Sequence, residues 1–316
     1  MVMVRRRQEQ WKEHIGSRQG ASVGEMHSLL KDHRQQNVTM LLRADGTLTS
    51  SLQEVDELLR AEWLPVFQKC CPATAIPEPS WEAFKTRFGA HVPQHCDGRV
   101  DALTPIILRE TLGRMSNKTS LGAGGWSVQE LKLLPDALLE LLCEFFHLVE
   151  RTGHWPETLC LGLITPLVKD ELLPLCTGNT RPITVMPLLY RVWASSRVRQ
   201  LIDWQAQWLS PCVCSYRPEY GCEDAWFEEA LRVGQALLKG EPLCGPSIDL
   251  SKAFDSLPQA ILLQMAAEVG MDANVLRALR GMYGSLRRRF RIDGHIGQPF
   301  SPQTASYRGA RCQCSS

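Results

Sequence analysis

One short segment combines a carboxylate, an aromatic ring and an apolar run. Ser247–Pro258 has the sequence SIDLSKAFDSLP, in which Asp249 ends the apolar run and Phe254 comes five residues later. Phosphoryl transfer needs oxygen ligands that hold one or two Mg²⁺ ions over the attacking and leaving oxygens. Asp249 on a rigid strand end would suit that role, the Leu250 carbonyl could add a ligand, and Phe254 could lie beneath a sugar and exclude a 2′-hydroxyl. The pattern also fits an ordinary strand end and a turn capped by Asp255, because two aspartates at this spacing often occur by chance.

A second group of candidate residues is basic. Residues 277–291 hold six Arg and no acidic residue, and four of the six lie close around Phe290: Arg287, Arg288, Arg289 and Arg291. Like charges on neighbouring strand positions repel one another unless an anion is near. The segment could therefore contact nucleic-acid phosphates, and an exposed basic hairpin without a ligand is an equally open interpretation.

Periodicity and turn residues predict the elements that position these side chains. Strands are predicted at Leu161–Val168, at Ser247–Leu250 and at Leu286–Ile292, the last closed by an Asp293-Gly294 hairpin turn. Helices are predicted at Trp81–Phe88, 103–115, 127–134, 135–152, Leu188–Trp208, Cys222–Lys239, Pro258–Val269 and Asp272–Tyr283. Local signals mark several helix ends, namely a capping box of Ser127 and Glu130, stops at Gly153 and Gly240, and an N-cap at Asp272. Asp249 and the arginines would then lie on strands.

The composition is that of an ordinary globular protein. Its 316 residues are 44% hydrophobic and 22% charged, with 35 Lys+Arg against 34 Asp+Glu, which excludes collagen-like and disordered chains and suggests roughly two domains. The sequence has no apolar stretch of about 18 residues that could span a membrane, and its first residues have no secretory signal. The 12 Cys therefore indicate reduced thiols, and their spacing is poor for zinc. We expect an intracellular protein, nuclear or cytoplasmic and not secreted.

Six segments in order resemble the reverse transcriptase domain of non-LTR (LINE-type) retrotransposons. SIDLSKAFDSLP is similar to the first catalytic motif of the palm in that family. The segments before it are LGAGGWSVQE (121–130), GHWPETL (153–159), ITPLVKD (164–170), TRPITVMPLL (180–189) and SYRPEYGCEDA (215–225). They resemble the loop that opens the fingers, the G-x-W-P turn, the two halves of the PK…RPI block and the GFRPGRSTxDA segment. The resemblance covers roughly residues 105–300, and the ordered series is far more specific than any single motif.

The resemblance implies an α+β fold with the fingers and palm of a right-hand polymerase. It also implies RNA-directed DNA polymerase activity, with Mg²⁺, an RNA template, a DNA primer and deoxynucleoside triphosphates. Carried over residue by residue, the roles are catalysis by Asp249, metal binding by Asp249 and Leu250, nucleotide binding by Lys169, Arg181 and Phe254, and nucleic-acid binding by Arg217, Arg287, Arg288, Arg289 and Arg291. Lys169 and Arg181 suit phosphate but also fit solvated loop charges. Arg217 equally fits a surface residue beside Tyr216.

Two departures from the family pattern bear on activity. Arg308–Ser316 begins like the family's R-G-x-R-Q-G-C-P-L-S segment, but Cys312 replaces Gln and Gln313 replaces Gly, where a side chain would obstruct close backbone approach. No Tyr-x-Asp-Asp turn follows Asp249, so the partner metal carboxylates and the thumb are expected to be missing. We therefore expect a fragment that is inactive as this chain and binds Mg²⁺ weakly or not at all.

The expected organisation has three parts. Residues 1–115 are predicted to be a mainly helical, loosely attached connector, 116–245 the fingers, and 246–316 a truncated antiparallel palm sheet that carries Asp249. An incomplete sheet would leave an exposed edge beside residues 247–250, which favours aggregation. The alternatives to a polymerase fragment are a non-catalytic, nucleic-acid-binding remnant of the same domain and an unrelated helical interaction protein.

Overall fold

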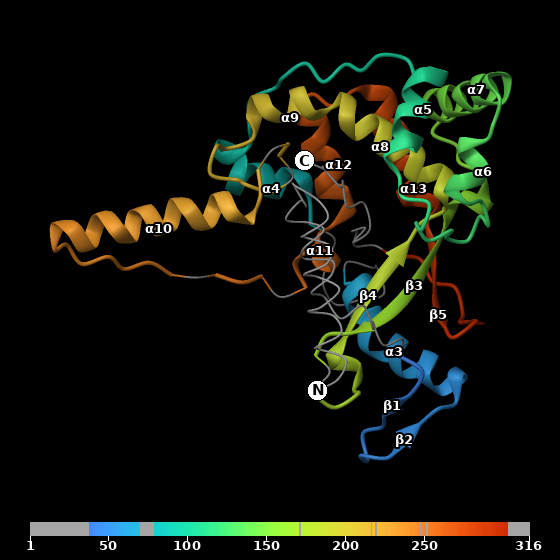
Figure 1. Cartoon of the computed structure of the whole chain (residues 1–316), viewed down its shortest axis with the longest axis horizontal. Coiled ribbons are helices and arrows are strands. Elements are labelled where there is room, and N and C mark those ends of the chain that lie inside the picture. Colours follow the sequence, from blue (N-terminus) through green and yellow to red (C-terminus); the bar gives the residue numbers. More distant parts are fainter. Residues whose placement is uncertain are drawn as a thin grey trace, which may run out of the picture.

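The computed structural model describes residues 38–69, 79–170, 172–215, 217–218, 220–246, 248–250 and 252–302. Its helices are α3 (Leu52–Phe67), α4 (Trp81–Phe88), α5 (Pro105–Arg114), α6 (Val128–Lys132), α7 (Asp136–Thr152), α8 (Leu188–Gln200), α9 (Ile202–Trp208), α10 (Cys222–Lys239), α11 (Ala253–Ser256), α12 (Gln259–Glu268) and α13 (Ala273–Ser285). The strands are β1 (Leu41–Leu42), β2 (Leu48–Thr49), β3 (Leu161–Val168), β4 (Thr180–Val185), β5 (Arg287–Ile292) and β6 (His295–Ile296). This mixture of helices and small sheets is compatible with the α+β class (Figure 1).

The main sheet has the strand order β4-β3-β5-β6. β3 pairs antiparallel with β4 and parallel with β5. Of the residues of β3, only Leu161–Ile164 pair with β5. At Pro166 the β5 side of β3 is therefore a sheet edge, while on the other side Pro166 faces Pro182 of β4. Proline cannot donate a ladder hydrogen bond, so this edge position accommodates Pro166.

The predicted strand at Ser247–Leu250 is wrong for the residues that the structure describes. Ile248–Leu250 belong to no strand, and the side chains of Ile248 and Leu250 are 79% and 71% exposed. A strand needs a neighbour for its backbone N–H and C=O groups, and no described strand pairs with these residues. The expected palm sheet and its exposed edge are therefore not formed here, and β5, which we expected in that sheet, pairs with β3 instead.

Helix ends follow the local signals closely. The Ser127 N–H donates to Glu130 Oε2 at 2.7 Å and the Glu130 N–H donates to Ser127 Oγ at 3.2 Å, which completes the predicted capping box. Gly153 and Gly240 end α7 and α10 with left-handed φ angles of 73° and 66°, a conformation that glycine adopts without steric cost. The Asp272 side chain caps α13. These predictions are confirmed because each depends on a few neighbouring residues.

The predicted single helix Leu188–Trp208 is two helices, α8 and α9, which meet at Leu201. The Trp204 indole N–H donates to the Val269 carbonyl at 3.2 Å. This tertiary contact fixes α9 against the end of α12, and periodicity along the chain does not encode it.

The larger hydrophobic core lies among α5, α7, α8 and α13, and it includes residues from the predicted connector. Leu103, Leu108 and Leu112 are at most 2% exposed within this core. Trp155 lies at its centre, in edge-to-face contact with Tyr190 and Trp193. The described part of residues 1–115 is thus integrated into the fold, and the prediction of loose attachment is wrong for it. The division of the chain at residues 115 and 245 remains a prediction.

A second core lies between α3 and one face of the main sheet (Figure 1). It contains Trp63 and Phe67 from α3, with Ile164, Phe290 and Ile292 from β3 and β5. The burial pattern of β5 alternates along the strand, so its even-numbered side chains pack toward this core. α3 is therefore a structural layer that covers one face of the main sheet.

Candidate nucleotide and nucleic-acid site

Lys169 and Arg181 lie close to the end of the β3–β4 hairpin. Both are exposed. The turn that carries them is tied by Asn179, whose buried side chain accepts from the Asp170 N–H at 3.1 Å and donates to the Asp170 carbonyl at 2.8 Å. The Lys169 ammonium donates to the Gly178 carbonyl at 2.6 Å. The hairpin therefore presents two cations from a braced turn.

Trp63 of α3 connects this hairpin to the segment that carries Asp249. The Lys169 Nζ lies 5.9 Å and the Lys252 Nζ 4.5 Å from the centre of the Trp63 ring, distances typical of cation–π contacts. The indole N–H donates to Thr180 Oγ1 at 3.2 Å, and Lys252 forms an ion pair with Glu62 at 3.1 Å. The Trp63 side chain thus contacts both the β3–β4 hairpin and the SIDLSKAFDSLP segment.

Sequence reasoning did not select Trp63 or Lys252. Lys252 lies inside the recognised motif and could have been found as a third cation. It adopts a left-handed backbone conformation, with φ of 48°, in the turn that precedes α11. Trp63 carried no such signal, because its role depends on contacts with residues more than 100 positions away.

Asp249 itself is exposed. It precedes Lys252 by three residues, which span at most about 10 Å of chain. Phe254 lies in α11, but its side chain is outside the described residues. Asp255, the alternative turn cap, is only 3% exposed.

The described residues do not make up a Mg²⁺ site. Asp249 and the Leu250 carbonyl would offer two protein oxygens, whereas Mg²⁺ requires six ligands in near-ideal octahedral geometry. Within the described ranges, no three His, Cys, Asp or Glu side chains are grouped closely enough to hold a metal ion.

The arginines of β5 divide between the two faces of the sheet. Arg287 is exposed, and Arg289 and Arg291 are partly exposed on the same face. Arg288 is fully buried on the α3 face, with its guanidinium carbon 5.1 Å from the centre of the Phe67 ring. Arg288 therefore cannot contact phosphate at the surface, because the period of two along a strand points it into the core. Three of the four predicted arginines remain candidates.

Arg217 lies in a loop away from regular structure. Its guanidinium donates to the Pro211 carbonyl at 3.1 Å and lies 4.8 Å from the centre of the Tyr220 ring. Tyr216, the partner that we considered in the alternative interpretation, is outside the described residues. Arg217 is thus a surface residue stacked on a nearby tyrosine, and template contact remains a prediction.

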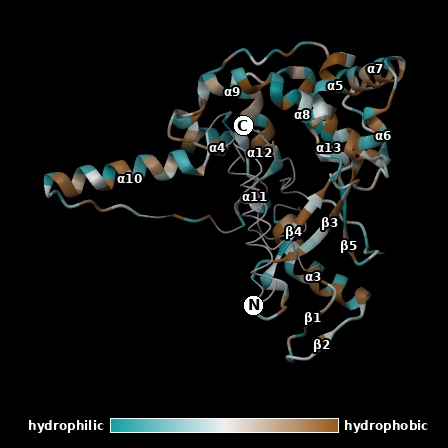
Figure 2. Ribbon diagram, in the orientation of Figure 1, coloured by the Kyte–Doolittle hydropathy of each residue, from teal (hydrophilic) through white to brown (hydrophobic). Residues whose placement is uncertain are grey.

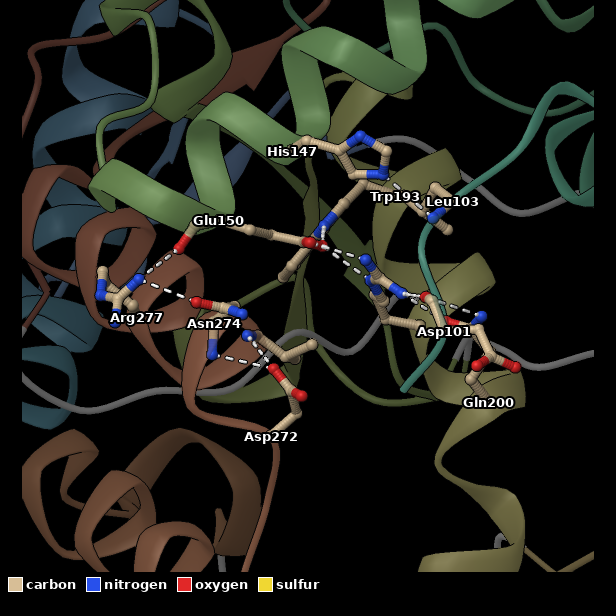
Figure 3. Close-up of polar contacts among 11 residues, drawn as sticks. Asp101, Leu103, His147, Glu150, Trp193, Gln200, Asp272, Asn274 and Arg277 are labelled. Carbon is tan, nitrogen blue, oxygen red and sulfur yellow. Dashed lines mark hydrogen bonds and ion pairs between the residues drawn. The ribbon is translucent and has the colours of Figure 1, made fainter. Parts of the chain in front are cut away.

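A polar cavity of about 300 Å³ provides a second candidate site (Figure 3). It is lined by Asp101, His147, Glu150, Arg197 and Asn274, among others. The buried Glu150 carboxylate forms an ion pair with Arg197 at 2.6 Å and accepts from the Trp193 indole N–H at 2.7 Å. These charged groups satisfy one another, so the cavity wall is a structural network that joins α7 to α8.

No protein-family model matches the chain. Of the helices in the described part of the chain, none has the length and apolar character needed to cross a lipid bilayer. The functional assignment consequently depends on the ordered motifs and on the site geometry described above.

Proposed function

We propose that this chain belongs to the reverse transcriptase domain of a non-LTR retrotransposon. The observation that carries the proposal is the meeting of Lys169 and Lys252 at the Trp63 ring. These lysines come from two motifs that are far apart in the sequence, and the resemblance assigns both motifs to the nucleotide site. Such a meeting is expected of a polymerase fragment and has no evident reason in an unrelated helical protein.

The chemistry that this arrangement favours is binding of a triphosphate. Arg181 offers a planar fork for phosphate oxygens, and Lys169 and Lys252 offer point charges. In the absence of ligand, Lys252 is paired with Glu62 and Lys169 with a backbone carbonyl. A bound polyphosphate would offer both lysines phosphate groups, which carry more negative charge than the Glu62 carboxylate or the Gly178 carbonyl.

Nucleotide affinity tests this proposal directly. We expect a fluorescent deoxynucleoside triphosphate to bind the chain, and K169A/R181A to weaken that binding by at least about tenfold, because each charge-assisted hydrogen bond contributes about 1.5–3 kcal/mol. The matched control is R114A/K118A, which removes two exposed cations at a different place in the fold. No measurable binding by the unaltered chain, or equal losses in both variants, would contradict the nucleotide site.

Non-catalytic binding of nucleic acid is the second candidate function, and the row of Arg287, Arg289 and Arg291 favours it. A duplex of RNA template and DNA primer is the expected ligand. The binding constant K falls as salt rises, so the slope of log K against log salt concentration is negative. Replacement of all three by Ala should make this slope less steep by up to about 3, because each phosphate contact contributes about 0.9. R99A/R114A/R232A is the control, since these arginines are exposed on other elements. An unchanged slope would remove the β5 row from the interface.

Primer extension tests whether the chain is catalytic. We expect no extension with deoxynucleotides and Mg²⁺, because two-metal transfer requires carboxylates that the described residues do not bring to Asp249, and misplacement by about 1 Å can cost roughly 100-fold in rate. Extension that disappears in Asp249→Asn would show that this expectation is wrong and that the chain is a working polymerase.

A further inference from the structure

Lys252 adopts an unusual backbone conformation. Its φ of 48° and ψ of 34° lie in the left-handed region, which is costly for residues other than glycine, asparagine and aspartate. Among the described residues, Asp293 is the one other non-glycine residue with positive φ, and it belongs to the turn between β5 and β6. Lys252 is in no such hairpin. Conformations of this kind persist where the surrounding structure holds them, so contacts with the rest of the fold hold Lys252.

Two contacts with α3 hold this residue. The Lys252 ammonium forms an ion pair with Glu62 at 3.1 Å and lies 4.5 Å from the centre of the Trp63 ring. Glu62 and Trp63 are neighbours on α3, a helix on which Figure 2 shows hydrophilic and hydrophobic residues side by side. Trp63 is buried, but the side chains of Lys252 and Glu62 are 32% and 34% exposed. The ion pair is therefore accessible to a competing anion from solution.

Lys252 also marks a border between exposed and packed chain. Before it, Ile248 and Leu250 are exposed and belong to no strand. After it, α11 contacts α3, and Asp255 within α11 is buried. Release of Lys252 would therefore free the preceding segment, which carries Asp249, while α11 stays in place.

We propose that Glu62 is an autoinhibitory lock, which holds Lys252 against α3 until a polyphosphate displaces it. This inference rests on the proposed function, because the displacing anion is the triphosphate of a nucleotide. A ligand shifts a conformational equilibrium only by its difference in affinity for the two states. Lys252 provides that difference, since its ammonium is neutralised by Glu62 in the locked state and is free for phosphate in the released state.

Nucleotide affinity tests the competition. We expect E62Q to bind a fluorescent deoxynucleoside triphosphate about twofold to fivefold more tightly than the unaltered chain, because a partly exposed ion pair no longer opposes binding. The control E110Q removes the same charge at an exposed site on α5 and should leave the affinity unchanged.

A double-mutant comparison shows whether Glu62 acts through Lys252. E62Q/K252A should bind no more tightly than K252A, because the lock has nothing to hold once Lys252 is replaced. An equal gain from E62Q with and without Lys252 would show general charge repulsion and would overturn the lock.

Trypsin cleavage after Lys252 gives a second test that needs no nucleotide. The protease can bind the Lys252 side chain only after it has left α3, whereas Lys239 is exposed on α10. We expect E62Q to raise the rate of cleavage after Lys252, relative to that after Lys239, by about twofold to fivefold. E110Q should leave the ratio unchanged, and an unchanged ratio in E62Q would overturn the lock.

The two measurements separate failure of the lock from failure of the proposed function. Nucleotide binding by the unaltered chain without a gain in E62Q would overturn the lock alone. Absence of nucleotide binding in both chains would overturn the lock together with the proposed function.

Discussion

At the residue scale, Glu54 links folding to acid pH. Its carboxylate accepts from Arg43 Nε at 2.5 Å, from Arg43 Nη2 at 2.9 Å and from Thr49 Oγ1 at 2.7 Å. These hydrogen bonds lower the pKa of Glu54 from its usual 4.5 to about 2. A lowered carboxyl pKa stabilises the folded state fully above pH 4.5, and this contribution is lost as the pH falls from 4.5 toward 2.

Replacement of Glu54 by Gln should therefore lower the free energy of unfolding at pH 7 and leave a smaller deficit at pH 3. Urea titrations at the two pH values measure the difference. Glu57→Gln on the same helix is the control, because Glu57 is exposed and should give little change at either pH. A deficit of equal size at pH 7 and pH 3 would show that the Glu54 charge is not the cause.

The ion pair of Glu150 and Arg197 is a residue-scale feature of a different kind, because it is buried. The side chains are 6% and 4% exposed, and removal of one partner leaves the other charge buried without compensation. Arg197→Ala should destabilise the protein by about 3–5 kcal/mol. Arg109→Ala, which breaks the exposed pair with Asp136, should cost no more than about 1 kcal/mol. Chemical denaturation compares them, and equal costs would contradict the structural role of the buried pair.

At the element scale, the packing of α13 against the end of α7 depends on a glycine. A Cβ atom on Gly281 would lie 1.6 Å from the Gly153 carbonyl oxygen, whereas a Cβ on Gly284 of the same helix would meet no atom within 4 Å. Gly281→Ala should therefore cost at least about 2 kcal/mol through forced displacement of the two helices. Gly284→Ala should be neutral or stabilising by up to about 1 kcal/mol. Thermal unfolding of the pair tests this, and similar melting temperatures would contradict the close contact.

The same scale shows which elements the sequence could predict. The ends of α7, α10 and α13 were predicted correctly because a glycine or an aspartate acts on the backbone within one turn. The strand at 247–250 was wrong because a strand is defined by its partner, and the chain around Asp249 does not indicate whether one is present. The partnership of β3 with β5 was missed for the same reason, since their residues are more than 120 positions apart.

The residues of the candidate site also differ in whether the sequence alone could identify them. Lys169, Arg181 and Asp249 were selected by motif, and the structure places the first two at one hairpin end. Arg288 was grouped with its neighbours by charge alone, and only the burial of one face of β5 separates it from them. Trp63 could not be selected, because an aromatic residue on an amphipathic helix usually belongs to the core, and it does so here while also contacting both lysines.

At the scale of the whole molecule, the parts of the chain that precede and follow the exposed segment between Ser210 and Leu250 pack against each other. Residues before Ser210 and after Leu250 meet in several places, of which two join the sheet and the larger core. β5 hydrogen-bonds to β3, and the Trp155 indole N–H donates to the Ala278 carbonyl of α13 at 2.8 Å. Every described residue between these limits is at least partly exposed. A break within this segment therefore removes few of the packing contacts that stabilise the rest.

We accordingly expect brief trypsin treatment to cut first at Arg232 or Lys239, where local opening costs least free energy. The two fragments should stay together on a sizing column under native conditions and separate in denaturant, because the sheet and the α7–α13 contact join them without the intervening chain. First cleavage within α7 or α13, or separation of the fragments without denaturant, would show that α10 is not a dispensable projection but part of what holds the two halves together.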